Sequence, residues 1–232
     1  MTNKYKVIGF DADDTLWVNE PYFQDTEKRF AELMSEYGPP EFIREELYRT
    51  EMANLADYGY GAKGFSLSLI ETALRLSGGR NLDRFVEEII GYVKDLVNKP
   101  VILLEGVGEL LEKLKSCGYR LIVATKGDLR DQERKLEISG LTSFFHHIEI
   151  MTDKKTENYR KLLSHLDIRP EEFLMVGNSL RSDILPVLEM GGHAVLVPFH
   201  TSWIHESAEK PADNGRFHEL ESLTELDKIL FI

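Results

Sequence analysis

The stretch "KVIGFDADDTL", residues 6–16, joins an apolar run to three aspartates that fall within four positions. The apolar part predicts a strand at residues 6–12 that is buried on both faces, as in a parallel sheet. Carboxylates placed this close repel one another and raise each other's pKa, unless a cation or a reaction requires them. The crowding of Asp11, Asp13 and Asp14 therefore predicts a functional site directly after the strand.

Four further runs are short, apolar and rich in β-branched residues, and each predicts another buried strand. They recur about every 20–30 residues, with amphipathic helical patterns between them. This is the spacing of βαβ units, which build a parallel sheet covered by helices. The four runs occupy residues 120–126, 146–152, 172–178 and 193–199.

The gap between the first and second runs has a different character. Residues 18–98 contain no strand-like run but four amphipathic helical patterns, separated by turns rich in glycine and proline. One pattern repeats apolar residues at i, i+3, i+4 and i+7 from Phe30 to Tyr37, which marks one face of a helix. We therefore predict an α/β protein whose Rossmann-like core, residues 1–17 and 99–232, is interrupted by an all-helical cap domain at 18–98.

The composition narrows the classes of partner. The chain has 232 residues and a net charge of −12, which argues against nucleic acid or an anionic membrane as the main partner. A small phosphorylated substrate remains compatible with this charge if a bound cation reverses the local field. With Cys117 as the single cysteine and no apolar stretch long enough to span a bilayer, we expect a cytoplasmic protein.

Polar residues follow each of the first four predicted strands. In an open parallel sheet the carboxyl ends of the strands share one edge, and ligands bind there. We therefore expect carboxylate, amide, hydroxyl and ammonium groups to converge on one pocket, with the aspartates sharing a cation. The groups are Asp11 and Asp13, then Thr125 and Lys126, then Asp153 to Lys155, and finally Asn178 to Asp183.

This set resembles the four motifs of the haloacid dehalogenase-like hydrolase superfamily, in the family's order. The helical insertion after the first motif is similar to that family's mobile cap. One residue departs from the usual pattern: Asn178 stands where the fourth motif more often has an aspartate. The matching segments are "DADDT" at 11–15, "VATKG" at 123–127, "TDKKT" at 152–156 and "GNSLRSD" at 177–183.

The resemblance implies a phosphatase mechanism with assigned roles. Asp11 would attack phosphorus and form an aspartyl-phosphate, and Asp13 would act as general acid and then as general base. The resemblance also implies Mg²⁺, which prefers oxygen ligands. Its ligands would be the carboxylate of Asp11, the backbone carbonyl of Asp13, and the loop that carries Asn178 and Asp183.

The resemblance further implies how the phosphate is held. The hydroxyl of Thr125 would bind phosphoryl oxygens, and Lys126 is a candidate for substrate contact. The lysine of the third motif is Lys154 or Lys155, with the spacing to the following helix favouring Lys154. In the predicted cap, the loop "DYGYGAKGF" carries Lys63, a candidate for reading the substrate.

We therefore predict Mg²⁺-dependent hydrolysis of a small phosphate monoester. Alternatives within the same superfamily are a phosphoryl transferase or mutase and a haloacid dehalogenase. Asp13 favours a phosphatase over a dehalogenase, because a leaving alcohol needs a proton and a halide does not. A phosphate-accepting signalling or binding module and an inactive member of the fold are the non-enzymatic alternatives.

Overall fold

A computed structural model describes residues 4–212 and 215–230. The chain divides into two compact units, which we describe separately. The core unit consists of residues 4–20, 101–126 and 132–230, and the helical unit consists of Pro21–Pro100 and Gly127–Asp131.

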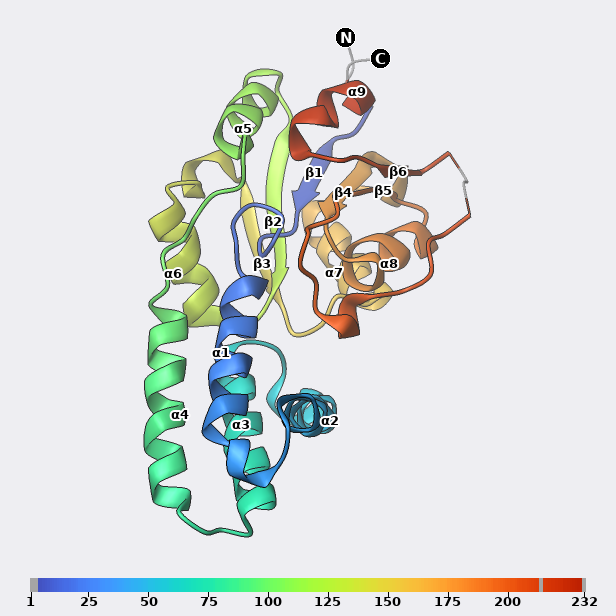
Figure 1. Cartoon of the computed structure of the whole chain (residues 1–232). Helices are drawn as coiled ribbons and strands as arrows, with labels where there is room; N and C mark the ends of the chain where they lie inside the picture. The colour runs from blue at the N-terminus through green and yellow to red at the C-terminus, as the bar shows by residue number, and fades with distance from the viewer. Residues whose placement is uncertain (1–3, 213–214, 231–232) are drawn as a thin grey trace. The chain divides into compact units, whose positions relative to one another are not determined.

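The core unit is built on a parallel sheet (Figure 1). Its strand order is β3-β2-β1-β4-β5-β6, so β1 is paired with β2 on one side and β4 on the other. The order of strands reverses at β1, which makes its carboxyl end the switch point where ligands bind in such sheets. The strands are β1 (Val7–Phe10), β2 (Arg120–Lys126), β3 (His147–Met151), β4 (Phe173–Gly177), β5 (His193–Leu196) and β6 (Phe217–Glu219).

Helices cover both faces of this sheet (Figure 1). Along β1, Ile8 and Phe10 pack into the core under α5 (Val107–Ser116), α6 (Leu129–Ser139) and α9 (Asp227–Leu230). Val7 packs on the opposite face, under α7 (Thr156–Leu166) and α8 (Leu185–Glu189). This alternation explains the continuous apolar run in the sequence, because both faces of the strand are buried. Shorter turns of 3₁₀ helix lie at Thr142–Phe144, Pro170–Glu172, Ile204–Glu206 and Leu223–Leu226, and a π turn at Leu180–Ile184.

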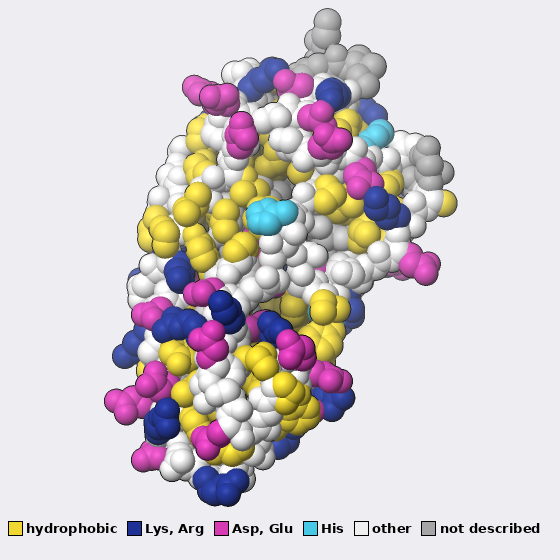
Figure 2. Space-filling model, viewed as in Figure 1, with side chains coloured by type: hydrophobic (Ala, Val, Ile, Leu, Met, Phe, Trp, Pro, Cys, Tyr) yellow, Lys and Arg dark blue, Asp and Glu magenta, His cyan; other side chains and the backbone are white. Residues whose placement is uncertain are grey.

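The helical unit contains α1 (Glu20–Leu33, whose first residue belongs to the core unit), α2 (Pro40–Tyr58), α3 (Ala62–Ser77) and α4 (Leu82–Val97), with a 3₁₀ turn at Ser35–Tyr37. Its own apolar core includes Phe30, Phe65 and Phe85. On its surface, basic and acidic side chains are interspersed (Figure 2), as in the ion pair of Arg29 with Asp95 at 3.1 Å.

The predicted fold class is confirmed: an α/β core with a parallel sheet and an inserted all-helical segment. The strand β6 was not predicted, and α6 was expected only as one of the helices between the strands, without bounds. The segment that forms α6 is highly charged, and β6 is a three-residue strand whose pairing with β5 defines it. Among the described residues, no helix combines the length and apolar character needed to cross a membrane.

Candidate active site

Asp11 lies at the carboxyl end of β1, where the strand order reverses. Its backbone N–H still bonds the carbonyl of Val176 on β4, at 2.9 Å, so the sheet itself fixes its position. The chain then turns tightly, and the hydroxyl of Thr15 returns to donate to Asp11 Oδ2 at 3.3 Å. Asp11 is 7% exposed. The buried carboxylate of Asp11 thus accepts a hydrogen bond from the Thr15 hydroxyl, and it lies at the carboxyl end of β1.

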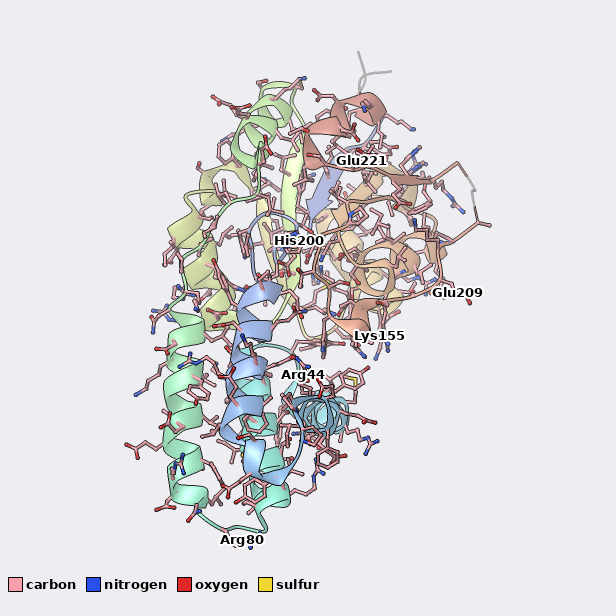
Figure 3. The ribbon with its side chains drawn as sticks, in the orientation of Figure 1. Arg44, Arg80, Lys155, His200, Glu209 and Glu221 are labelled. Carbon is pink, nitrogen blue, oxygen red and sulfur yellow. The ribbon has the colours of Figure 1, made fainter. Side chains whose placement is uncertain are left out.

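Lys154 brings the third predicted motif to Asp11. Its ammonium donates to Asp11 Oδ1 and, at 2.7 Å, to Asp183 Oδ1. The neighbouring Lys155 points to the surface (Figure 3), where its side chain is 79% exposed and pairs with Asp153. The structure therefore places Lys154, and not Lys155, in contact with the carboxylates.

The electrostatics of this group are unbalanced, because two buried carboxylates share one ammonium. Burial raises the pKa of Asp11 to about 7; Lys154 opposes the shift, and Asp183 and Asp13 add to it. For Lys154, burial alone would lower the pKa, but Asp11 and Asp183 raise it well above its ordinary value. A further cation at this point would favour the ionised form of Asp11.

The loop after β4 supplies the groups of the fourth motif. Asp183 is 1% exposed, and its Oδ2 accepts the backbone N–H of Ser179 at 3.0 Å, which closes the loop. Gly177 makes this approach possible, because a Cβ there would lie 2.3 Å from Asp183 Oδ2. Asn178 Oδ1 accepts from the hydroxyl of Thr15 at 3.4 Å. The loop after β4 is thereby joined to the loop after β1.

The donor set suits a hard cation such as Mg²⁺. Lys154 contacts Asp11 and Asp183, and Thr15 contacts Asp11 and Asn178. The oxygen-bearing side chains of Asp183 and Asn178 therefore both lie near that of Asp11. Among the residues that the structure describes, no three His, Cys, Asp or Glu side chains form a metal-binding cluster. The candidate set is instead two carboxylates and an amide, which are oxygen ligands of the type that Mg²⁺ takes together with water.

Asp14, the third aspartate of the crowded stretch, has a separate role. It adopts a left-handed backbone conformation with a φ of 59°. Its carboxylate accepts the backbone N–H groups of Asn19, at 2.8 Å, and Glu20, at 2.9 Å, where α1 begins. Burial raises the pKa of Asp14 to about 7, although the N–H of Asn19 opposes the shift. The three crowded aspartates therefore have different roles: Asp11 and Asp13 belong to the candidate site, and Asp14 caps α1.

Asp13 is surrounded by hydrogen-bond donors, two of which sequence reasoning missed. Its Oδ1 accepts from Trp17 Nε1 at 2.7 Å and from Lys135 Nζ at 2.7 Å, and its Oδ2 accepts from Gln132 Nε2 at 3.0 Å. Lys135 and Gln132 lie on α6. The available signal was a lysine and a glutamine three positions apart, beside the apolar Leu136, in a charged segment.

Thr125 and Lys126, at the end of β2, are tied into the same region. Thr125 is 2% exposed and accepts from Gln132 Nε2 at 2.8 Å. The ammonium of Lys126 donates to Ser182 Oγ at 2.8 Å and to Glu206 Oε1 at 2.6 Å. No sequence pattern singled out Glu206, which lies in the 3₁₀ turn at Ile204–Glu206, far along the chain from Lys126.

Glu206 is a half-buried anion of the core unit, with its side chain 18% exposed. Its Oε2 accepts from the hydroxyls of Ser179 and Ser182, on the loop after β4. Burial would raise the pKa of Glu206, but the ammonium of Lys126 and the two serine hydroxyls outweigh it and lower the pKa to about 2. Glu206 therefore connects the loop after β4 to the end of β2.

Lys63, the predicted substrate-reading residue, belongs to the helical unit. Its backbone N–H donates to Asp128 Oδ2 at 2.9 Å, and its ammonium lies 3.5 Å from Asp128 Oδ1. Its side chain is 75% exposed. Contact between Lys63 and a substrate stays a prediction.

Three comparisons relate this geometry to known proteins. The family model described as haloacid dehalogenase-like hydrolase matches residues 5–191. A glyceraldehyde 3-phosphate phosphatase of Pyrococcus furiosus is 28% identical over 195 residues, which cover 81% of this chain and 78% of that one. The pyrophosphatase PpaX of Bacillus cereus is 26% identical over 182 residues, 76% of each chain. The crystal structure of a haloacid dehalogenase-like family hydrolase from Xanthomonas campestris matches with a TM-score of 0.86 and 35% identity, covering 98% of this chain and 91% of that one.

Proposed function

Since this chain belongs to the haloacid dehalogenase-like hydrolases, we propose that it hydrolyses a small phosphate monoester through an aspartyl-phosphate, with Mg²⁺ as cofactor. The membership that the four motifs indicate is thus confirmed. Two of the relatives above are named as a phosphatase and a pyrophosphatase, which supports a phosphorylated substrate. The single cysteine and acidic composition are in keeping with a cytoplasmic enzyme of small metabolites.

The contact of Lys154 with both Asp11 and Asp183 carries this proposal. Asp11, which the sheet holds at its switch point, thereby lies beside an ammonium that can stabilise the negative charge of a phosphoryl group. The hydroxyl of Thr15 orients the other oxygen of Asp11. A buried, oriented carboxylate next to a fixed cation is the arrangement that a carboxylate nucleophile requires.

The proposed reaction has two displacements at phosphorus. In the first, an oxygen of Asp11 bonds to phosphorus, the bond to the ester oxygen breaks, and Asp13 gives its proton to that oxygen. In the second, water attacks the aspartyl-phosphate, Asp13 takes a proton from the water, and the bond to Asp11 breaks to release inorganic phosphate. Thr125 holds phosphoryl oxygens during both steps. One carboxyl group thus serves in turn as acid and as base.

The proposed Mg²⁺ ligands are the carboxylates of Asp11 and Asp183, the amide oxygen of Asn178, and the backbone carbonyl of Asp13. When bound, the ion would neutralise the repulsion between an anionic nucleophile and an anionic phosphate. The two buried carboxylates of Asp11 and Asp183 share the single ammonium of Lys154, which supports the proposal of a further cation at this point.

The first test compares the wild type with Asp11→Asn in the presence of Mg²⁺, using p-nitrophenyl phosphate and a panel of phosphorylated metabolites and haloacids. We expect the wild type to release inorganic phosphate and the variant to lose more than about 1,000-fold in kcat. Retained turnover in Asp11→Asn would overturn the nucleophile. Release of halide, or transfer of phosphate to a sugar hydroxyl instead of water, would favour a dehalogenase or a mutase.

The second test concerns Lys63, which we propose as a specificity residue. We expect Lys63→Ala to change the relative kcat/KM values across the metabolite panel while leaving p-nitrophenyl phosphate hydrolysis within about twofold of the wild type. Unchanged selectivity would remove Lys63 from the proposal without affecting the residues of the core unit.

A further inference from the structure

The side chain of Asp13 receives more donors than a residue in a surface turn needs. Trp17 and Lys135 both donate to Oδ1, each at 2.7 Å, and Gln132 donates to Oδ2 at 3.0 Å. The Asp13 side chain is nevertheless 25% exposed, so water could have satisfied it. The three donors therefore do more than replace water: they restrict the orientation of the Asp13 carboxyl group.

Two of these donors come from α6 and are themselves buried. Gln132 is 3% exposed and Lys135 is 7% exposed. They are three positions apart, which puts them on the same face of the helix. Burying a lysine and a glutamine is costly unless their polar groups are used. Here both groups are directed at one carboxyl group of the core unit.

The two ends of the Gln132 amide are in different situations: its nitrogen lies near several acceptors, while its oxygen has no partner in the described part of the chain. Its Nε2 lies 3.0 Å from Asp13 Oδ2, 2.8 Å from Thr125 Oγ1 and 2.7 Å from the carbonyl oxygen of Lys126. Its Oε1 is buried and has no hydrogen-bond partner among the described residues. An unsatisfied buried acceptor destabilises the fold, and such exceptions call for an explanation. The orientation of this amide serves Asp13 and the end of β2.

The two oxygens of Asp13 are not equivalent. A carboxylate oxygen offers two lone pairs. Oδ1 has both occupied, by Trp17 and Lys135, whereas Oδ2 has one occupied, by Gln132. The remaining acceptor site is therefore on Oδ2, the oxygen that shares Gln132 with Thr125.

We propose that Gln132 and Lys135 are positioning residues for the proton transfer by Asp13, and that the proton passes through Oδ2. This inference rests on the proposed function, in which Asp13 is the general acid and Thr125 holds the phosphate. Lys135 and Trp17 fill Oδ1 and prevent the carboxyl group from rotating. Gln132 keeps Oδ2 next to the hydroxyl of Thr125, and therefore beside the phosphoryl group that Thr125 would hold and whose leaving oxygen takes the proton.

The dependence of the rate on the leaving group tests this positioning role. The kcat/KM value includes the first displacement, in which the leaving oxygen receives the proton. An alkyl phosphate such as glycerol phosphate needs that proton, whereas p-nitrophenyl phosphate has a stable anion as its leaving group. Misplacing Asp13 should therefore affect the alkyl ester more, and general acid catalysis is worth about 10²–10⁴-fold where it is needed.

The experiment measures kcat/KM for both esters, and for phenyl phosphate between them, in five proteins of the full chain with Mg²⁺. They are the wild type, Asp13→Asn, Lys135→Met, Gln132→Met and, as control, Glu133→Gln. Glu133 is an exposed neighbour on α6. Lys135→Arg is assayed in the same way as an additional variant, and thermal unfolding of every protein checks that α6 remains folded.

We expect the ratio of alkyl to p-nitrophenyl kcat/KM to fall most in Asp13→Asn. It should fall about 10- to 100-fold in Lys135→Met and Gln132→Met, recover in part in Lys135→Arg, and stay unchanged in Glu133→Gln. Equal losses on all three esters in Lys135→Met and Gln132→Met would mean a structural role and would overturn the inference. If Asp13→Asn itself leaves the ratio unchanged, the general acid of the proposed function is wrong. If Lys135→Met does not fold, Gln132→Met and Lys135→Arg decide the outcome.

Discussion

Lys154 and Asp183 form an ion pair inside the core unit, with 2.7 Å between Nζ and Oδ1 and each side chain 1% exposed. The same ammonium contacts Asp11. Lys154 thus joins the segment after β3 to the loop after β4 and to the end of β1. One side chain thus connects three separate parts of the chain.

Replacing Lys154 should therefore affect both catalysis and stability. We expect Lys154→Met to lower kcat with p-nitrophenyl phosphate at least about 100-fold, because a fixed positive charge is lost. It should also lower the free energy of unfolding by about 3–5 kcal/mol, because two buried carboxylates lose their partner. Lys155→Met is the matched control and should change neither quantity measurably, since that side chain is 79% exposed. Equal losses in the two variants would contradict the assignment of Lys154.

A third carboxylate should tighten metal binding. Asn178→Asp would add a charged oxygen ligand to the proposed set of Asp11 and Asp183, so we expect activity to saturate at about tenfold lower Mg²⁺. In EDTA the same variant should unfold at a lower temperature than the wild type, because three carboxylates then repel one another. Asn178→Ala should shift the Mg²⁺ requirement in the opposite direction. An unchanged Mg²⁺ dependence in both variants would remove residue 178 from the metal ligands.

The close approach of Gly177 and Asp183 predicts a costly alanine substitution. In Gly177→Ala the new Cβ would lie 2.3 Å from Asp183 Oδ2, so the loop after β4 must move. We expect a loss of about 1–3 kcal/mol in the free energy of unfolding and a large loss of activity. Gly91→Ala in α4 is the control: nothing lies within 4 Å of its Cβ, and the variant should gain about 0.5–1 kcal/mol. Denaturant titrations of both variants measure the difference.

Glu206 should make stability depend on pH in acid. Its pKa is lowered from an ordinary 4.5 to about 2, so its carboxylate stabilises the fold above about pH 4.5. This contribution is lost as pH falls through the folded pKa, because the unfolded chain binds the proton first. We expect Glu206→Gln to lower the free energy of unfolding by roughly 1–3 kcal/mol at pH 7, with a difference that shrinks as pH falls from about 4.5 toward 2.

The control for this pH dependence is Glu209→Gln, an exposed residue three positions along the same segment (Figure 3). It should leave the free energy of unfolding unchanged over the same pH range. A difference between wild type and Glu206→Gln that is constant with pH would contradict the proposed contribution of the carboxylate.

The sheet was predictable because its signals are local. A strand buried on both faces needs a continuous apolar run, as at Val7–Phe10, and the residue directly after the run must lie at the edge of the sheet. Asp11, Thr125 and Asn178 could therefore be assigned to one edge from their positions alone. The four amphipathic patterns of residues 18–98 likewise fall on helical segments, although the first, from Phe30 to Tyr37, runs from the end of α1 into the 3₁₀ turn at Ser35–Tyr37.

The partners of these residues were not predictable in the same way. In α6 a buried glutamine and a buried lysine occur among exposed charges, and no periodic apolar pattern distinguishes them. Glu206 lies in a short 3₁₀ turn, and its contacts with Lys126 and the loop after β4 span distant parts of the sequence. Such pairings depend on which segments pack together.

The amino-acid sequence by itself determined a parallel α/β core with a helical insertion, and the residues that end each strand. It did so because strand burial and helix amphipathicity repeat over a few neighbouring residues. Only the tertiary structure decided that Lys154 faces the carboxylates while Lys155 faces solvent, and that α6 holds Asp13. Those choices depend on where a side chain points once distant segments have packed, since two adjacent lysines have the same chemistry until one of them is buried between charges.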